Sequence, residues 1–312
     1  MKDMQEHNMQ PPKKNKETRC TIKPLQDLNL MDDFLFDVMT MDLDACKIII
    51  ELSLGIRLKN IRWKEGQKVF HNLPGKRAVR LDFCAEDEDG NLFDVEMQKR
   101  NIGNIPKRTR FYQALLDAPL LKSGEEGFDN LKPLYIVMVC GFDLFGLKKY
   151  RYTFENFCRE VPGMSLGDEC RKIVLNTKGE NDEEEERSLI DFLHYIEQSN
   201  EENLPEDCDD RLKELHKKIL HIKSSEEMEV TYMKAEERER LIKEEGRIEG
   251  RAEGRAEGRA LSILELLEDL GTLSEEQEEK ILREEDVEKL SNWCKLAAKA
   301  KSLKEFCERA EL

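Results

Sequence analysis

Residues 79–85 (VRLDFCA) and 93–98 (FDVEMQ) decide the fold, because apolar and polar residues alternate in both stretches around the acidic turn 87–91 (DEDGN). Alternation with a period of two is typical of a half-buried β-strand, and a glycine-containing turn between two such runs indicates a hairpin. The sequence therefore predicts two antiparallel strands, at 78–86 and 92–99.

The register of this hairpin follows from its hydrophobic pattern. Opposed residues of antiparallel strands share a face, so the apolar residues of one strand must pair with the apolar residues of the other. A three-residue loop, 88–90, with Gly90 in the left-handed region gives this pairing. Asp82 then lies directly opposite Glu96. A tighter two-residue turn would shift the register by one residue, and the apolar pattern argues against it.

Two opposed carboxylates, with Cβ atoms roughly 5 Å apart, repel each other unless a positive charge lies between them. A divalent cation is the usual solution, and Mg²⁺ prefers oxygen ligands of this kind. The alternative is that Asp82 and Glu96 lie on the solvated face of a half-exposed hairpin, with Arg80 as an ordinary partner. Alternation of this kind is common on exposed sheet faces, so the pattern alone leaves both interpretations open.

The neighbouring segments predict an α/β fold with a mixed sheet flanked by helices. Two helices are expected between residues 28 and 55, the second capped by Asp44 and ended by Gly55. A helix with Pro106 in its first turn is expected at 106–121, before a buried strand. The other expected elements are a short strand at 61–63, the buried strand at 134–140 (LYIVMVC), edge strands at 150–154 and 173–176, and helices at 188–198, 212–222 and 228–245.

The composition changes after residue 177 and divides the chain. We expect a disordered tail at 1–20, an α/β domain at 28–200, a charged helical linker at 201–260 and a small helical C-terminal region at 261–312. The linker contains four EGRx repeats from Glu245 onwards. Four glycines make such a helix marginal on its own, by roughly 1 kcal/mol each relative to alanine. It is therefore either a neck ordered by self-association into a homo-oligomer or a semi-flexible charged linker.

The charge balance restricts how this chain could bind DNA. Its formal net charge is −16, from 51 basic and 67 acidic residues, so it is a poor general binder of nucleic acid. A local basic patch is required, and one follows the predicted hairpin. Its members are the basic residues and the neighbouring tyrosine expected to contact DNA: Lys99, Arg100, Lys107, Arg108, Arg110 and Tyr112. The alternative for this patch is a solvated flank of the helix.

Nine cysteines are scattered without any CxxC pair, which fits reduced thiols better than disulfides or a zinc site. The first 20 residues lack an apolar signal segment, and no apolar run approaches the length of a membrane span. We therefore expect a soluble, cytoplasmic protein. No phosphate-binding glycine loop is present, so ATP use is not expected.

The motifs LDF, DVEMQ and RTRFYQ, in this order, resemble those of the PD-(D/E)XK nuclease superfamily. More closely, residues 29–177 resemble the bacterial recombination-promoting nuclease and transposase family. The resemblance implies a metal-dependent DNA endonuclease that hydrolyses phosphodiester bonds, with Asp82, Glu96 and Gln98 as catalytic residues. Mg²⁺, or Mn²⁺ in its place, would be held by Asp82, Glu96 and the carbonyl of Met97.

One position departs from the superfamily pattern. Gln98 stands where a lysine is common, and a neutral amide can position a water molecule but cannot deprotonate it. Two other function classes therefore remain open. The first is a catalytically inactive DNA-binding or interaction protein that keeps the nuclease fold, and the second is an oligomeric scaffold whose helical tail is the functional part.

Overall fold

The computed structural model describes residues 22–63, 81–121 and 127–312. The predicted tail at 1–20, Arg80 and the predicted start of the first hairpin strand lie outside these ranges. The chain forms two compact units, Met1–Glu229 and Val230–Leu312. In the described ranges, no helix is long and apolar enough to cross a membrane.

The first unit is built on a mixed six-stranded sheet. Its strand order is β1-β2-β3-β4-β6-β5, with β3, β4 and β6 parallel and the other pairs antiparallel. The strands are β1 (Ile61–Trp63), β2 (Phe83–Asp87), β3 (Leu92–Gln98), β4 (Leu134–Cys140), β5 (Arg151–Phe154) and β6 (Cys170–Asn176). The expected α/β fold with a mixed sheet is confirmed. One detail of it was wrong, because β6 is not at an edge but lies between β4 and β5.

The hairpin has the predicted register. Phe83 pairs with Val95 and Ala85 pairs with Phe93, as the apolar pattern requires. Gly90 has a φ of 86°, in the left-handed region that the three-residue loop demands. The turn is closed by hydrogen bonds from the amides of Gly90 and Asn91 to the backbone and side chain of Asp87. The two strands therefore present the same residues to each face as predicted.

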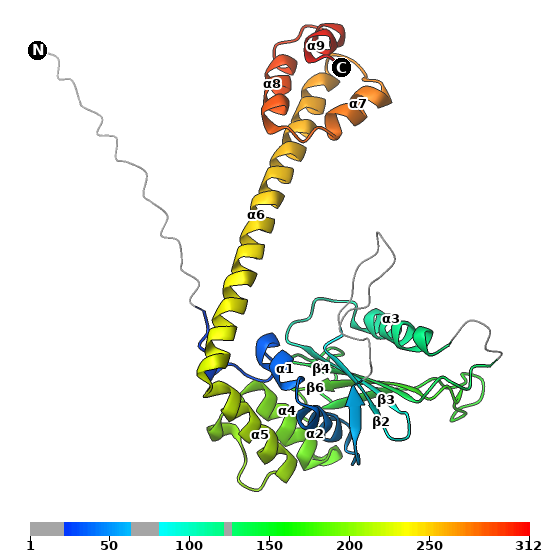
Figure 1. Ribbon diagram of the computed structural model, residues 1–312. Helices are drawn as coiled ribbons and strands as arrows, with labels where there is room; N and C mark the ends of the chain where they lie inside the picture. Colours follow the sequence, from blue (N-terminus) through cyan, green and yellow to red (C-terminus); the bar gives the residue numbers. More distant parts are fainter. Residues whose placement is uncertain (1–21, 64–80, 122–126) are drawn as a thin grey trace, which may run out of the picture. The chain divides into compact units, whose positions relative to one another are not determined.

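Helices cover both faces of the sheet (Figure 1). Helices α1 (Asp33–Met39), α2 (Leu43–Leu54), α4 (Arg187–Glu197) and α5 (Asp210–Lys223) lie on one face, and α3 (Ile105–Asp117) lies on the other. The apolar side of α3 packs on alternate residues of β3, β4 and β6, and the residues of this cluster include Ile105, Tyr112, Leu116, Leu92, Leu134, Ile136, Met138 and Val174. Both faces of the central strands are therefore buried, and α3 covers the face that carries Asp94 and Glu96.

The cap of α2 differs from the prediction. Asp42 is the N-cap, and its side chain accepts hydrogen bonds from the amides of Asp44 (2.9 Å) and Ala45 (3.3 Å). Asp44 lies inside the first turn, where its own amide needs an acceptor, so its predicted role as the cap was wrong. Gly55 ends the helix with a φ of 71°, as predicted.

The second unit is helical and has its own core. It contains most of α6 (Glu226–Glu268), followed by α7 (Glu275–Leu282), α8 (Val287–Ala297) and α9 (Leu303–Ala310). The buried residues of this core are Ala256, Ala260, Ile263, Leu267, Ile281, Leu290, Trp293, Ala297, Phe306 and Ala310. Ser274 and Gln277 form a capping box at the start of α7. Helix α6 runs without a break from the EGRx repeats into the leucine-rich segment 261–268.

Candidate active site

Three acidic side chains gather on the face of the sheet beneath α3. Asp94 and Glu96 are alternate residues of β3, and Asp82 immediately precedes the first paired residue of β2. Glu96 is 1% exposed, Asp94 is fully buried, and Asp82 is partly buried. The alternative of a solvated hairpin face is therefore wrong, because α3 removes this face from water.

Asp82 and Glu96 lie opposite each other and are joined through the backbone. The amide of Asp82 donates to Oε1 of Glu96 at 2.9 Å, and the amide of Met97 donates to Oδ2 of Asp82 at 3.0 Å. Each carboxylate thus accepts from the strand that carries the other. This arrangement holds both side chains at the carboxyl end of β3, where the polypeptide leaves the sheet toward α3.

Asp94 is the member of the acidic group that sequence reasoning missed. Neither of its carboxylate oxygens has a hydrogen-bond partner in the described part of the chain. A buried carboxylate without a partner is costly, so such a group usually marks a functional role or a missing cation. The sequence does place Asp94 on the same face of the sheet as Glu96, because the two are alternate residues of one strand. It does not show that α3 buries this face.

Burial and mutual repulsion raise the pKa of all three carboxyl groups and so favour their protonated forms. The pKa of Asp82 is raised to about 6, chiefly by burial and also by the nearby Asp37 and Asp33 of α1. Burial also raises the pKa of Asp94 and Glu96 well above their usual range, and the negative charge of Asp82 adds to this effect. A cation bound among these oxygens would reverse these shifts.

Arg108 of α3 lies against this acidic group. Its Nη1 donates to Oε1 of Gln98 at 2.6 Å, and its Nη2 lies 3.4 Å from Oε2 of Glu96. The hydroxyl of Tyr112, one turn further along α3, accepts from Nη2 at 2.6 Å and from Nε at 3.2 Å. Tyr112 is only 3% exposed, and burial raises its pKa to about 12. Both side chains therefore turn inward, toward the end of β3.

The amide of Gln98 connects Arg108 to the backbone beside the acids. Its Oε1 accepts from Arg108, while its Nε2 donates to the carbonyl oxygen of Met97 at 2.8 Å. The structure therefore brings the three predicted catalytic residues and the predicted carbonyl ligand into one connected network. A carbonyl oxygen has two lone pairs, so Met97 retains acceptor capacity beyond this bond.

The remaining basic residues of the predicted patch lie at the surface. Arg100, Lys107 and Arg110 are exposed. Lys99 points away from the acids and forms an ion pair with Asp32, which precedes α1. The patch is thus divided into an inward pair, Arg108 and Tyr112, and outward basic side chains around the β3–α3 connection.

The donor set of the acidic group fits a hard divalent cation. The oxygens of Asp82, Glu96 and Met97 are the ligand types that Mg²⁺ prefers, and the buried carboxyl group of Asp94 lies next to them without a hydrogen-bond partner among the described residues. Across the described ranges, no group of three or more histidine, cysteine, aspartate or glutamate side chains is arranged to hold a metal ion. A site here therefore depends on two carboxylates and a carbonyl, and on water or substrate oxygens for the remaining positions.

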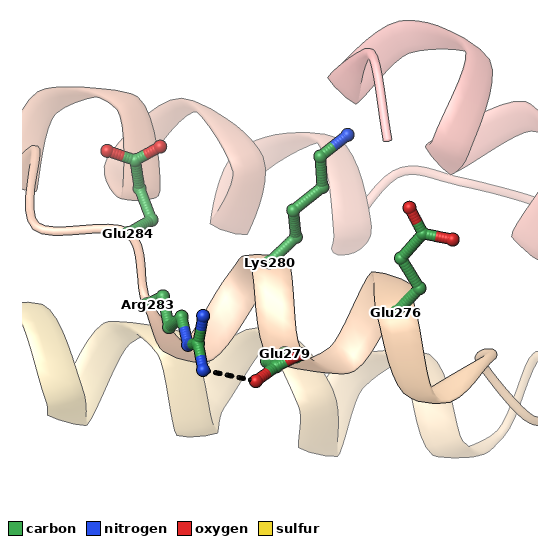
Figure 2. Close-up of a pocket in the computed structure, with 5 residues that line it drawn as sticks. All are labelled: Glu276, Glu279, Lys280, Arg283 and Glu284. Atoms are coloured by element: carbon green, nitrogen blue, oxygen red, sulfur yellow. Dashed lines mark ion pairs between the residues drawn. The ribbon is translucent and has the colours of Figure 1, made fainter.

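Two other charged clusters lie outside this acidic group. The first includes the carboxylate of Glu51 on α2. It is buried, accepts from the amide of Leu58 at 2.8 Å and pairs with Arg211 at 3.4 Å. The second lines a pocket of about 230 Å³ along α7 and the two residues that follow it, and it includes the ion pair of Arg283 with Glu279 (Figure 2).

Comparison with known proteins agrees with this geometry. No curated protein and no solved structure matches the chain. The family model described as "PD-(D/E)XK nuclease family transposase" matches residues 57–246, which is more than half of the 312 residues and includes the whole acidic group. The chain therefore belongs to the PD-(D/E)XK nuclease family transposases.

Proposed function

We propose that this protein is an Mg²⁺-dependent DNA endonuclease of the recombination-promoting type. The observation that carries the proposal is the buried acidic group at the end of β3, in which Asp82 and Glu96 lie opposite each other and Asp94 has no hydrogen-bond partner among the described residues. Family membership supports a nuclease or transposase type of function. The expected reaction is hydrolysis of a phosphodiester bond.

The residues have distinct roles in this proposal. Asp82, Glu96 and the Met97 carbonyl would hold Mg²⁺ or Mn²⁺, and such an ion lowers the pKa of water and neutralises charge on the phosphate. The Gln98 amide would position the attacking water by hydrogen bonding, since it cannot take a proton. Burial beneath α3 excludes bulk water from the carboxylates and strengthens their electrostatic interactions.

The surface around the β3–α3 connection suits a phosphate backbone. Arg100, Lys107 and Arg110 are exposed there, and Lys99 lies beside them in its pair with Asp32. Arg and Lys side chains in such positions neutralise phosphates and set the orientation of the duplex without reading its sequence. We propose that these residues contact DNA, while Arg108 and Tyr112 act inside the site.

Plasmid nicking tests the catalytic proposal. Wild-type protein should nick supercoiled DNA in Mg²⁺ and be inactive in EDTA. Asp82→Ala should reduce the rate at least about 100-fold, because it removes a predicted ligand of the ion. The matched control is Asp89→Ala in the exposed hairpin turn, which should retain the wild-type rate. Equal activity of the wild type and Asp82→Ala would refute the assignment.

A second candidate is an inactive DNA-binding or interaction protein that keeps the fold. Two observations favour it, namely that Gln98 replaces the usual lysine and that both ends of its amide are bonded within the protein. DNA binding without nicking in either Mg²⁺ or Mn²⁺ would support this candidate over the nuclease.

We also propose that the protein self-associates through its C-terminal helical region. Leu241 and Ile248 are seven residues apart on α6 and are 51% and 58% exposed. Residues at this spacing lie on one side of a helix, where they can meet the same side of a second copy.

A further inference from the structure

We propose that Arg108 is a positioning residue that takes the place of the divalent cation in the metal-free protein and competes with that cation for Glu96. This inference rests on the proposed nuclease function and concerns the regulation of the same site. It assigns Arg108 a role inside the protein rather than on the DNA.

The contacts of the guanidinium support this role. All three of its nitrogens donate hydrogen bonds to groups of the site. Nη1 donates to the side-chain oxygen of Gln98, and both Nε and Nη2 donate to the hydroxyl of Tyr112. Nη2 also donates to the carboxylate of Glu96. The Arg108 side chain is only 26% exposed. Little of the guanidinium is left to bind a phosphate, so its main partners are the residues around the predicted metal ligands.

Charge explains why an arginine is needed there. Asp94 and Glu96 are buried beside the partly buried Asp82, and among the described residues Arg108 is the basic side chain that pairs with Glu96. One guanidinium cannot neutralise three carboxylates, so the group still attracts a divalent cation. The guanidinium and the cation have the same electrostatic role, and each weakens the binding of the other to the Glu96 carboxylate.

The contact distances indicate which bond yields. The Arg108–Glu96 contact is the longest at 3.4 Å, whereas the bonds to Gln98 and Tyr112 are both 2.6 Å. Nη2 already donates to Tyr112, so it can lose Glu96 and still keep a partner. When a cation binds, Arg108 therefore releases Glu96 but continues to hold the Gln98 amide.

This arrangement predicts two separable effects of substitution. Arg108→Met removes the competing charge and the hydrogen bond to Gln98. The protein should therefore bind a divalent cation more tightly but hydrolyse DNA more slowly. Arg108→Lys keeps the charge but cannot reproduce the two-pronged bonding, since an ammonium lacks the planar fork. It should therefore retain wild-type cation affinity and show only the slower turnover.

The test is calorimetric titration of the full-length protein with Mn²⁺, combined with nicking rates at saturating Mn²⁺. Arg108→Met should bind Mn²⁺ about tenfold more tightly than wild type, and both Arg108 variants should lower kcat by about 10- to 100-fold with little change in KM for DNA. Arg108→Gln, which also removes the charge, should show the same gain in Mn²⁺ affinity and replaces Arg108→Met if that variant does not fold.

The matched control is Arg171→Met. Arg171 also bridges an acid and a tyrosine, donating to Glu155 at 2.6 Å and to the Tyr135 hydroxyl at 2.9 Å, but it does so outside the site. Its Mn²⁺ affinity and kcat should equal those of wild type. Suppose that the wild type binds Mn²⁺ and nicks DNA. If Arg108→Met and Arg108→Gln then bind Mn²⁺ no more tightly than the wild type, this inference alone is overturned. A wild type that neither binds Mn²⁺ nor nicks DNA would overturn the proposed function together with it.

Discussion

Asp94 is the residue at which burial and charge conflict most directly. Its carboxylate is fully buried without a hydrogen-bond partner among the described residues, and Asp82 raises its pKa further. A carboxyl group whose pKa is higher in the folded than in the unfolded protein binds more protons in the folded state. Its contribution to stability therefore decreases as the pH rises.

The metal-free protein should consequently lose stability as the pH rises from about 4, the unfolded value, through about 6, the folded pKa of Asp82. Asp94→Asn should reduce this loss and raise the stability at pH 7 by about 1–3 kcal/mol, because it removes a buried carboxyl group that must either keep its proton or bury a charge. Melting temperatures measured in EDTA across this pH range test the prediction. A metal-free protein that becomes more stable over the same range would contradict it.

Asp143 provides a control of opposite sign. Its side chain accepts from the amides of Gly146 (2.9 Å) and Lys148 (2.8 Å), and these bonds lower its pKa although burial opposes them. Its contribution is present above the unfolded pKa and is lost as the pH falls through the folded pKa. Asp143→Asn should therefore lower stability at neutral pH and leave the loss between pH 4 and 6 unchanged.

At the residue scale, local pattern predicted the acid pair but not its surroundings. Strand parity was sufficient to set Asp82 against Glu96, because opposed residues share a face. Parity cannot show that α3 covers that face, so Asp94 was missed. The proximity of Asp37 on α1 to Asp82 depends on tertiary packing between segments 45 residues apart in the numbering.

At the scale of elements, the strongest periodic signals were reliable. The hairpin register and the buried strand β4 were confirmed, because a misplaced apolar face would be exposed to water. The cap of α2 was misplaced by two residues, since several aspartates stand close together and only backbone geometry distinguishes them. The internal position of β6 was missed because strand order is set by nonlocal packing.

Helix α6 carries the prediction of self-association. Light scattering of the full chain should give the mass of two or more copies of the 36.5 kDa chain. Glu substitutions at Leu241 and Ile248 should return the protein to the monomer, because they would bury charge in the interface. Leu147→Glu, at an exposed position in the first unit, is the control and should leave the mass unchanged. A monomeric wild type would remove this proposal.

At the scale of the whole molecule, the compact units refine the domain proposal. The first unit continues to Glu229, beyond the end of the proposed domain at 28–200, because α5 packs against α1 and α2. The family model also continues past residue 200, to 246. We therefore propose that the nuclease domain includes α5. The sequence did not indicate this, because α5 is as charged as the linker that follows.

The central claim is that a cation lies between Asp82 and Glu96, and anomalous X-ray diffraction from crystals grown with Mn²⁺ tests it most directly. The account predicts an anomalous peak within ligand distance of both carboxylates and of the Met97 carbonyl oxygen, and no such peak in Asp82→Ala crystals. Well-ordered crystals at saturating Mn²⁺ with no peak at these oxygens, or with their only peak elsewhere, would contradict it.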